Sequence, residues 1–225
     1  YPNLVGVCLN LNDQPNNTIF GSETRCIAGR EYICETFGNL QFQLKADTFF
    51  QIYTEQAEAV LNLIIDRAGF TGTETLIDAY CGIGTFTLPL SKRVKRVVGI
   101  EVHSSSVVQA RANARLNGIT NIEFRTGEVE ELLPEMDIQA DVILLDPPRT
   151  GCDRAVLDAL TAMQPAQIIY ISCKPATLAR DLQILCEQGG YQLTYVQPAD
   201  FFPQTAHVEC VAFLTRAELA PITIE

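Results

Sequence analysis

Apolar and polar side chains alternate in the N-terminal part of the chain, which is the pattern of strands with one buried face. Residues 40–44 alternate strictly, and a Gly-Asn pair separates them from a second apolar segment at 32–37. This arrangement predicts a β-hairpin, and the apolar run at 5–11 predicts a further strand. We interpret residues 1–50 as what remains of a small antiparallel β lobe.

After residue 50 the spacing changes, and strand and helix patterns begin to alternate. Thr54 is expected to cap a helix that ends at Gly69. Strands are expected at 75–79, 97–101, 121–125, 141–145 and 167–172, and helices at 85–93, 104–117, 153–163 and 175–188. This alternation predicts an α/β fold with a doubly wound, mostly parallel sheet in residues 51–225. Two last strands, at 191–197 and 208–215, have no helix between them and predict an antiparallel end to the sheet.

Composition excludes two broad classes of protein. With 47% hydrophobic and 19% charged residues, the chain is too apolar for a disordered segment. Charged residues interrupt every apolar run before the ~18 residues that a membrane-spanning helix needs, so we expect no membrane partner. The net charge of −11 opposes non-specific attraction to nucleic acid. We interpret the basic residues at 92–96 as a solvated helix end rather than a phosphate site.

The eight cysteines are scattered along the chain and include no C-x-x-C pair. This spacing gives no support for a zinc or iron–sulfur centre, and we expect no metal site. We interpret the cysteines as reduced thiols of a cytoplasmic protein. The chain starts at Tyr1 with neither an initiating methionine nor a signal peptide, which predicts that it is a piece of a longer protein.

A glycine turn follows the first strand of the predicted parallel sheet. Asp78 ends that strand, Gly82 and Gly84 come next, and Glu101 ends the following strand 17 residues after Gly84. Glycines allow close approach to a ligand, and an acid at this distance suits a ribose, so the pattern indicates an adenosine-containing ligand. Because a third glycine and a P-loop lysine are absent, S-adenosylmethionine is favoured over NAD or ATP. The alternative is a tight turn with no ligand.

Two later strands also end in reactive residues. Asp146-Pro147-Pro148-Arg149 follows one of them, where the prolines stiffen a turn at the ligand edge; the alternative is an ordinary Asp-Pro turn. Cys173 ends the next, before a helix that starts near Pro175. A helix N-terminus and the neighbouring Lys174 give this thiol a reason for a lowered pKa, which favours a nucleophile over an inert buried cysteine.

The last strand is expected to begin with a candidate base. His207 and Glu209 alternate at its start and face the same side, and either side chain suits a general base. For the glutamate, the alternative is a solvated strand residue.

Taken together, five segments resemble the RNA uracil-C5 methyltransferases, the family that makes 5-methyluridine in tRNA and 23S ribosomal RNA. The similar residues span about 19–216 and fit in order and spacing. They are Phe49-Phe50-Gln51, Asp78 to Gly84, Asp146 to Arg149, Ser172 to Asp181, and the motif Phe202-Pro203-x-Thr205-x-His207-x-Glu209. The resemblance implies a class I S-adenosylmethionine-dependent methyltransferase fold and an RNA substrate, with ribosomal RNA in preference to tRNA.

The resemblance also implies a role for each matching residue. Cys173 is expected to add to C6 of the uracil, and Glu209 to remove the C5 proton. The residues expected to contact the methyl donor are Gln51, Asp78, Tyr80, Gly82, Gly84, Thr85, Glu101, Glu128 and Asp146. Among these, Gln51 and Asp146 are also expected near the target base. The target uracil must unstack from its neighbouring bases to enter the site, and unstacking costs least in RNA loops.

At two positions the sequence departs from the family pattern. Asparagine usually stands where this chain has Lys174, and often where it has Thr85. Two other functions therefore stay open. One is methylation of an exocyclic amine or a small molecule, although amine-modifying relatives carry an aromatic residue where Arg149 stands. The other is a non-catalytic RNA-binding or folding factor, which the presence of Cys173 and Glu209 disfavours.

Overall fold

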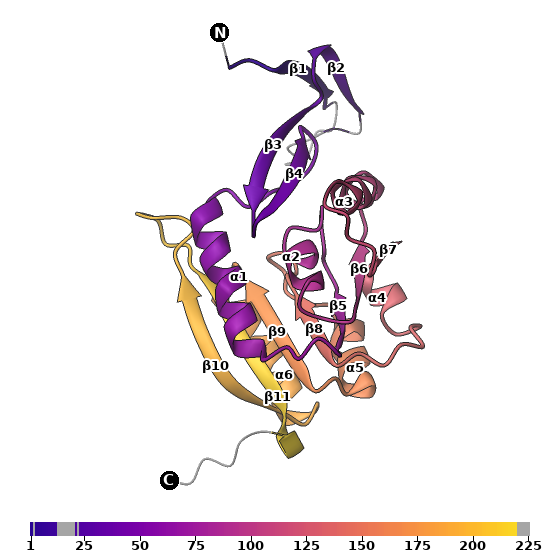
Figure 1. Cartoon of the computed structure of the whole chain (residues 1–225). Coiled ribbons are helices and arrows are strands. Elements are labelled where there is room, and N and C mark those ends of the chain that lie inside the picture. The colour runs from indigo at the N-terminus through magenta and orange to yellow at the C-terminus, as the bar shows by residue number, and fades with distance from the viewer. Residues whose placement is uncertain (2, 13–20, 22, 220–225) are drawn as a thin grey trace.

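One seven-stranded sheet organises the part of the chain that the computed structural model describes, which is residues 1, 3–12, 21 and 23–219. The strands lie in the order β10-β11-β9-β8-β5-β6-β7 (Figure 1). Only β11 runs antiparallel to its neighbours; the other pairings are parallel. The bounds are β5 (Thr75–Asp78), β6 (Arg96–Glu101), β7 (Ile122–Thr126), β8 (Val142–Leu145), β9 (Gln167–Ser172), β10 (Tyr191–Ala199) and β11 (Glu209–Arg216). The predicted α/β fold, with its antiparallel end, is confirmed.

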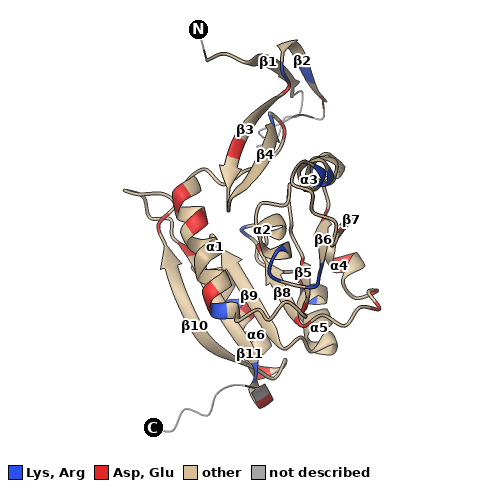
Figure 2. Cartoon of the chain, viewed as in Figure 1, with Lys and Arg blue, Asp and Glu red and all other residues tan. Residues whose placement is uncertain are grey.

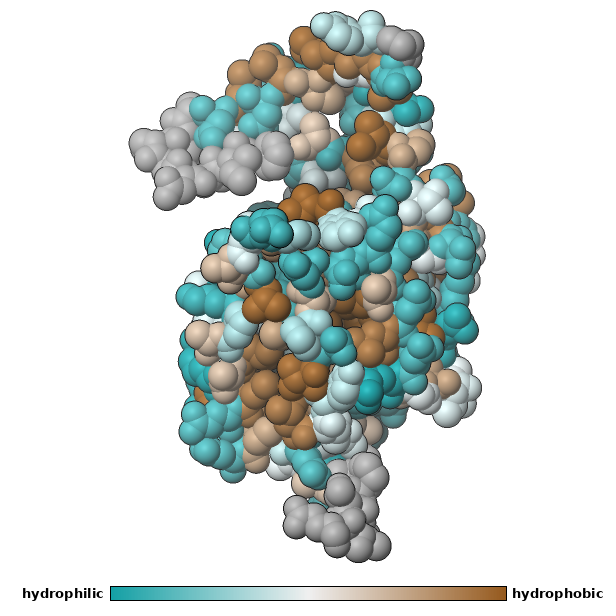
Figure 3. Space-filling view, turned by 90° about the vertical axis from the view of Figure 1, so that its left-hand side faces the viewer, coloured by the Kyte–Doolittle hydropathy of each residue, from teal (hydrophilic) through white to brown (hydrophobic). Residues whose placement is uncertain are grey.

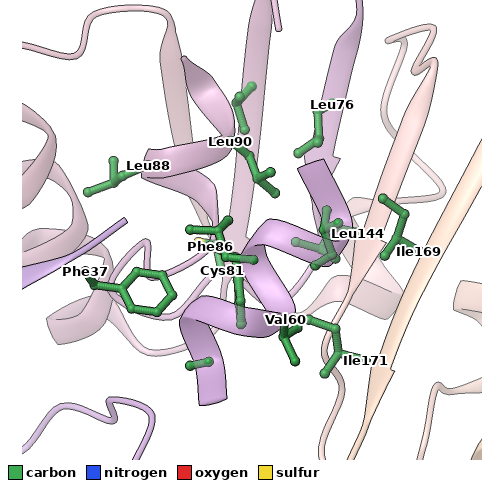
Figure 4. Close-up of a cluster of buried hydrophobic side chains, with 14 of the residues drawn as sticks. Phe37, Val60, Leu76, Cys81, Phe86, Leu88, Leu90, Leu144, Ile169 and Ile171 are labelled. Carbon is green, nitrogen blue, oxygen red and sulfur yellow. The ribbon is translucent and has the colours of Figure 1, made fainter. Parts of the chain in front are cut away.

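Helices cover both faces of the sheet. One face packs against α1 (Thr54–Ala68), α2 (Thr87–Ser91) and α3 (Ser104–Leu116), and the other against α4 (Val129–Leu132), α5 (Arg154–Met163) and α6 (Pro175–Glu187). A short 3-10 helix, Ala217–Leu219, follows the last strand. Alternate positions of the inner strands face the two layers. Leu144 and Ile169 enter the first core, part of which is drawn in Figure 4, and Ile143 and Ile168 enter the second.

Two hairpin-like sheets precede this domain. The predicted hairpin is present as β3 (Tyr32–Phe37) and β4 (Leu40–Lys45), while β1 (Gly6–Leu11) pairs with β2 (Glu23–Gly29). The tip of the β3–β4 hairpin is buried in the same core as α1, through Phe37, Leu40 and Phe42. By contrast, β1–β2 exposes apolar side chains, which are visible at the top of Figure 3.

Two expectations about the elements need correction, and two elements were not expected. The helix expected at 85–93 is only Thr87–Ser91, because the chain is still turning at Gly84 with φ +88°. Tyr53 occupies the N-cap of α1 without a side-chain hydrogen bond, so Thr54 is the first helical residue and not the cap. Strand β2 and the four-residue helix α4 were not predicted. The expected C-cap, Gly69, is confirmed by its left-handed φ of 63°.

Candidate active site

The predicted functional residues gather at the carboxyl edge of the sheet. Parallel strands β5, β6, β8 and β9 all end there. Because β11 runs antiparallel to β9, it begins where β9 ends, and Cys210 pairs with Ser172. This register sets Glu209 beside Cys173, although 35 residues of chain separate them. The edge therefore has the strand-end geometry at which open α/β sheets bind ligands.

The glycine turn after β5 is tied to the end of β6. Glu101 accepts a hydrogen bond from the backbone N–H of Gly82 at 3.0 Å and another from that of His103 at 2.7 Å. A Cβ added at Gly82 would meet no atom within 4 Å, so the turn borders open space on that side. A small ligand thus has room over this turn, next to the Glu101 carboxylate.

Asp78 and Thr85 lie beneath the turn. Asp78 is 2% exposed and accepts a hydrogen bond from the Thr87 hydroxyl at 2.6 Å. Burial raises the pKa of Asp78 to about 6, although the bonds from Thr87 and from the Tyr80 backbone oppose this shift. Thr85 is also buried. The observed contact of Asp78 is therefore with the start of α2, which it holds in place.

Three further residues predicted to contact the cofactor come from three different segments. Burial, followed by the nearby Cys152 thiol, raises the pKa of Tyr80 well above its ordinary value. Glu128 is exposed after β7 and precedes the first residue of α4, on the same edge as Glu101. Gln51 lies between β4 and α1, and α1 begins on the side of the sheet where β10 ends (Figure 1).

Alanine substitutions in the glycine turn should separate two costs in folding stability: backbone strain from a left-handed φ, and steric overlap of the added methyl group with a neighbouring side chain. Gly82→Ala is expected to destabilise the fold by about 1 kcal/mol, the cost of a left-handed backbone at φ +54° with space for the methyl group. Gly84→Ala should cost about 2–4 kcal/mol, because its added Cβ would also lie 2.9 Å from Leu88 Cγ. Urea unfolding of both variants measures the difference, and equal losses would contradict this account.

Charges converge on Cys173 from two other segments, the connection between β8 and α5 and the start of β11. Burial and the Glu209 carboxylate raise the pKa of the thiol, the Arg149 guanidinium lowers it through a hydrogen bond and its charge, and Asp146 raises it slightly. The net shift is upward, so the lowered pKa expected from the helix N-terminus and Lys174 is wrong. Lys174 itself is exposed. Local sequence could not show that Arg149 and Glu209 are the charges that face the sulfur.

Glu209 and Asp146 hold their protons more tightly than ordinary carboxyl groups. Burial raises the pKa of Glu209, and the Arg149 cation partly offsets that effect. Burial, followed by the Glu209 and Asp78 charges, raises the pKa of Asp146 to about 8. Four residues from three strand ends and one loop thus form a coupled group: a thiol, two carboxyls and one guanidinium. Arg149, which had no role assigned from sequence, is the cation of this group.

The Asp146 shift predicts how stability depends on pH. In the unfolded chain an Asp loses its proton near pH 4, whereas folded Asp146 keeps it until about pH 8, so stability should fall as the pH rises through this window. The raised pKa of Asp78 predicts a similar loss of stability, which is complete near pH 6. Between about pH 6 and 8, the melting temperature of the wild type should therefore drop at least about 3 °C more than that of Asp146→Asn. Parallel melting curves would contradict the shift.

Other predicted features lie outside this group. His207 precedes β11 instead of belonging to it, and its ring packs edge-on against Phe202 at 5.8 Å. The basic segment at 92–96 joins α2 to the start of β6, at the sheet edge opposite the site (Figure 2).

Among the described residues there is no cluster of three or more His, Cys, Asp or Glu side chains placed to hold a metal ion. No described helix combines the length and apolar content needed to cross a bilayer.

Comparison with known proteins gives consistent matches. A family model described as tRNA (uracil-5-)-methyltransferase matches residues 19–217. A Nostoc sp. protein named "uncharacterized RNA methyltransferase" is 58% identical over 97% of this chain and 47% of its own length. One of the same description from Halalkalibacterium halodurans is 44% identical over 95% of this chain and 47% of its own length. The chain therefore spans about half the length of the curated relatives it matches.

A solved structure shares both the fold and part of the sequence. It is the Pyrococcus abyssi tRNA (uracil-54, C5)-methyltransferase in complex with S-adenosyl-L-homocysteine, with a TM-score of 0.79 and 28% identity. The similarity covers 94% of this chain and 51% of that one. The Methanocaldococcus jannaschii TYW2 structure in complex with AdoMet, at 16% identity and a TM-score of 0.59, supports the fold alone. From the family match and the identities over nearly its whole length, the chain belongs to the tRNA (uracil-5-)-methyltransferase family.

Proposed function

We propose that this chain is the catalytic part of an RNA methyltransferase that transfers a methyl group to C5 of a uridine through a covalent bond between Cys173 and C6 of the base. The observation that carries the proposal is the register of β11 on β9. It brings a thiol and a carboxylate with a raised pKa to one point at the sheet edge, next to Arg149. One soft nucleophile and one base are what this reaction requires.

The residues around the glycine turn fit S-adenosylmethionine as the methyl donor. Open space borders Gly82, and Glu101 ends the adjacent strand, where a ribose-binding acid is expected. Tyr80, Thr85, Gly84 and Glu128 belong to the turns on either side, Asp146 lies near Cys173, and Gln51 precedes α1. When bound, the donor supplies a methyl group on a positively charged sulfur. No metal is needed to activate such a leaving group.

Three residues of the coupled group, Cys173, Arg149 and Glu209, then each have a step. The Cys173 thiolate adds to C6, and the displaced electron pair makes C5 nucleophilic enough to take the methyl group. The Arg149 guanidinium, which lowers the pKa of the thiol, stabilises the thiolate before the addition. Glu209 accepts the C5 proton. That electron pair restores the C5=C6 double bond and expels the Cys173 thiolate, which leaves 5-methyluridine.

Two other functions have less support. A methyltransferase for an exocyclic amine needs no thiol at the reaction point, whereas here Cys173 meets both a carboxylate and a guanidinium. A non-catalytic RNA-binding factor needs neither Glu209 nor its raised pKa. These functions remain as outcomes of the experiment that follows.

The test uses RNA that contains 5-fluorouridine, together with S-adenosylmethionine and the full-length protein. Fluorine at C5 cannot leave as a proton, so the methylated adduct should stay attached to Cys173 and shift on a denaturing gel. We expect a shifted band only when the methyl donor is present. Methylation of other RNA without a band would favour an amine target, and RNA binding without methylation would favour the non-catalytic factor.

The same assay addresses the identity of the RNA. We propose ribosomal RNA as the preferred substrate, whereas the similar P. abyssi protein is described as a tRNA methyltransferase. Transcripts of a tRNA and of 23S ribosomal RNA fragments, each with 5-fluorouridine, are compared at equal concentration. A band confined to the tRNA transcript would overturn the ribosomal preference without affecting the proposed reaction.

A further inference from the structure

The loop that carries Arg149 is fastened to the helix that follows Cys173. This loop, residues 147–153, runs from β8 to α5, and it lies against α6. The Thr177 hydroxyl donates to the carbonyl oxygen of Arg149 at 3.4 Å. Arg180 Nη2 donates to the carbonyl oxygens of Thr150 at 3.0 Å and Cys152 at 3.3 Å. Side chains from the first two turns of α6 therefore hold the loop backbone.

Asp181 is the buried centre of these contacts. Its carboxylate is fully buried, and Oδ2 accepts the Cys152 backbone N–H at 2.9 Å and the Tyr170 hydroxyl at 2.6 Å. Oδ1 accepts Arg180 Nε at 2.8 Å and lies 2.7 Å from Nη2. With four donors, the buried charge is well paired, and loss of either oxygen as an acceptor would leave donors unsatisfied.

A glycine allows the backbone of the 147–153 loop to approach the Asp181 carboxylate closely. Gly151 adopts φ +77°, and a Cβ there would lie 2.6 Å from Asp181 Oδ2 and 2.7 Å from Arg180 Nη2. The thiol of the next loop residue, Cys152, lies close enough to the Tyr80 side chain, which follows β5, to raise its pKa. Asp181 thus joins three segments: the Arg149 loop through Cys152, strand β9 through Tyr170, and helix α6, whose N-terminus follows Cys173.

We propose that Asp181, together with Arg180, is a positioning residue that holds the 147–153 loop so that the Arg149 guanidinium meets the Cys173 sulfur. The assignment of Cys173 as nucleophile, on which this rests, comes from the proposed function. The charges that act on Cys173 are those of Glu209, Arg149 and Asp146, so a change at Asp181 should reach the thiol through Arg149. A purely structural role would instead lower stability and leave the reactivity of Cys173 unchanged.

The experiment measures alkylation of Cys173 by iodoacetamide across a pH series, with the Cys173 peptide quantified by mass spectrometry. Asp181→Asn keeps the size of the side chain but can no longer accept on both atoms. We expect its Cys173 alkylation rate at pH 8 to fall about threefold to tenfold, with the profile displaced to higher pH. Arg180→Gln should do the same and serves if Asp181→Asn does not fold, since the Arg180 side chain is half exposed. Leu185→Ala, a core change on the same helix, is the control for lost stability.

A double variant decides whether the effect passes through Arg149. In an Arg149→Gln background, Asp181→Asn should add no further shift to the alkylation profile. An unchanged profile in Asp181→Asn and Arg180→Gln, or an equal shift with and without Arg149, would overturn the proposal. The assay contains neither RNA nor methyl donor. A failed 5-fluorouridine trap together with a displaced alkylation profile would therefore reject the proposed function and keep the positioning role.

Discussion

Replacing Cys173 with alanine should reduce methyl transfer by more than about 1,000-fold, because the uracil ring then has no group to activate its C5. The stable adduct with 5-fluorouridine RNA should disappear at the same time. Binding of S-adenosylmethionine, measured by calorimetry, should change little, since the residues proposed to hold the donor lie on other strands. The substituted side chain is partly exposed, so we expect the variant to fold.

Cys186→Ala is the matched control for this variant. Cys186 is also a partly exposed thiol, and it lies near the far end of α6, away from the coupled group. It should retain both methylation and the trapped band. If Cys173→Ala kept more than about a tenth of wild-type turnover, a covalent mechanism through this residue would be excluded.

Glu209→Gln should uncouple formation of the adduct from its release. The amide cannot accept the C5 proton, so turnover should fall by about 100-fold to 10,000-fold. Addition of Cys173 and methylation do not require that proton transfer, and a methylated adduct with ordinary uridine RNA should accumulate. A denaturing gel without any fluorinated base would reveal it. The raised pKa of Glu209 suits this role, because a base works best when its pKa lies near the working pH.

The control carboxylate is Glu187, exposed at the end of α6. Glu187→Gln should turn over normally and leave no adduct. If Glu209→Gln also lost the adduct formed with 5-fluorouridine RNA, Glu209 would act before methyl transfer and not as the final base.

The strands of the sheet could be predicted because most of them are apolar on both faces. All four residues of β8 are buried, and a short, continuous apolar run of this kind is typical of an inner strand of a parallel sheet. Strand β2 gave no such signal, since six of its seven residues are exposed and it forms a two-stranded sheet with β1. Helix α4, with four residues, is too short for a helical period to show.

The individual residues of the site could be predicted from the sequence, but the effects of their charges on one another's pKa values could not. Cys173 and Glu209 each follow or begin a recognisable strand, and family resemblance assigned their roles. Their mutual effect depends on the β9–β11 register, and that of Arg149 depends on a loop held by α6; both are tertiary. The pKa direction of Cys173 was wrong for this reason, because the prediction used only its chain neighbours.

The position of β11 has a consequence for synthesis of the protein. This strand follows every other strand of the sheet in the chain, yet it lies inside the sheet, between β9 and β10. Until the ribosome has released residues 209–216, the backbone hydrogen-bonding groups on one edge of the apolar strand β9 have no partner strand. Strand β10 likewise lacks β11, the strand with which it pairs. A nascent chain stopped before this strand would lack Glu209, the proposed base, and would also present an aggregation-prone edge. Premature termination should therefore yield insoluble protein.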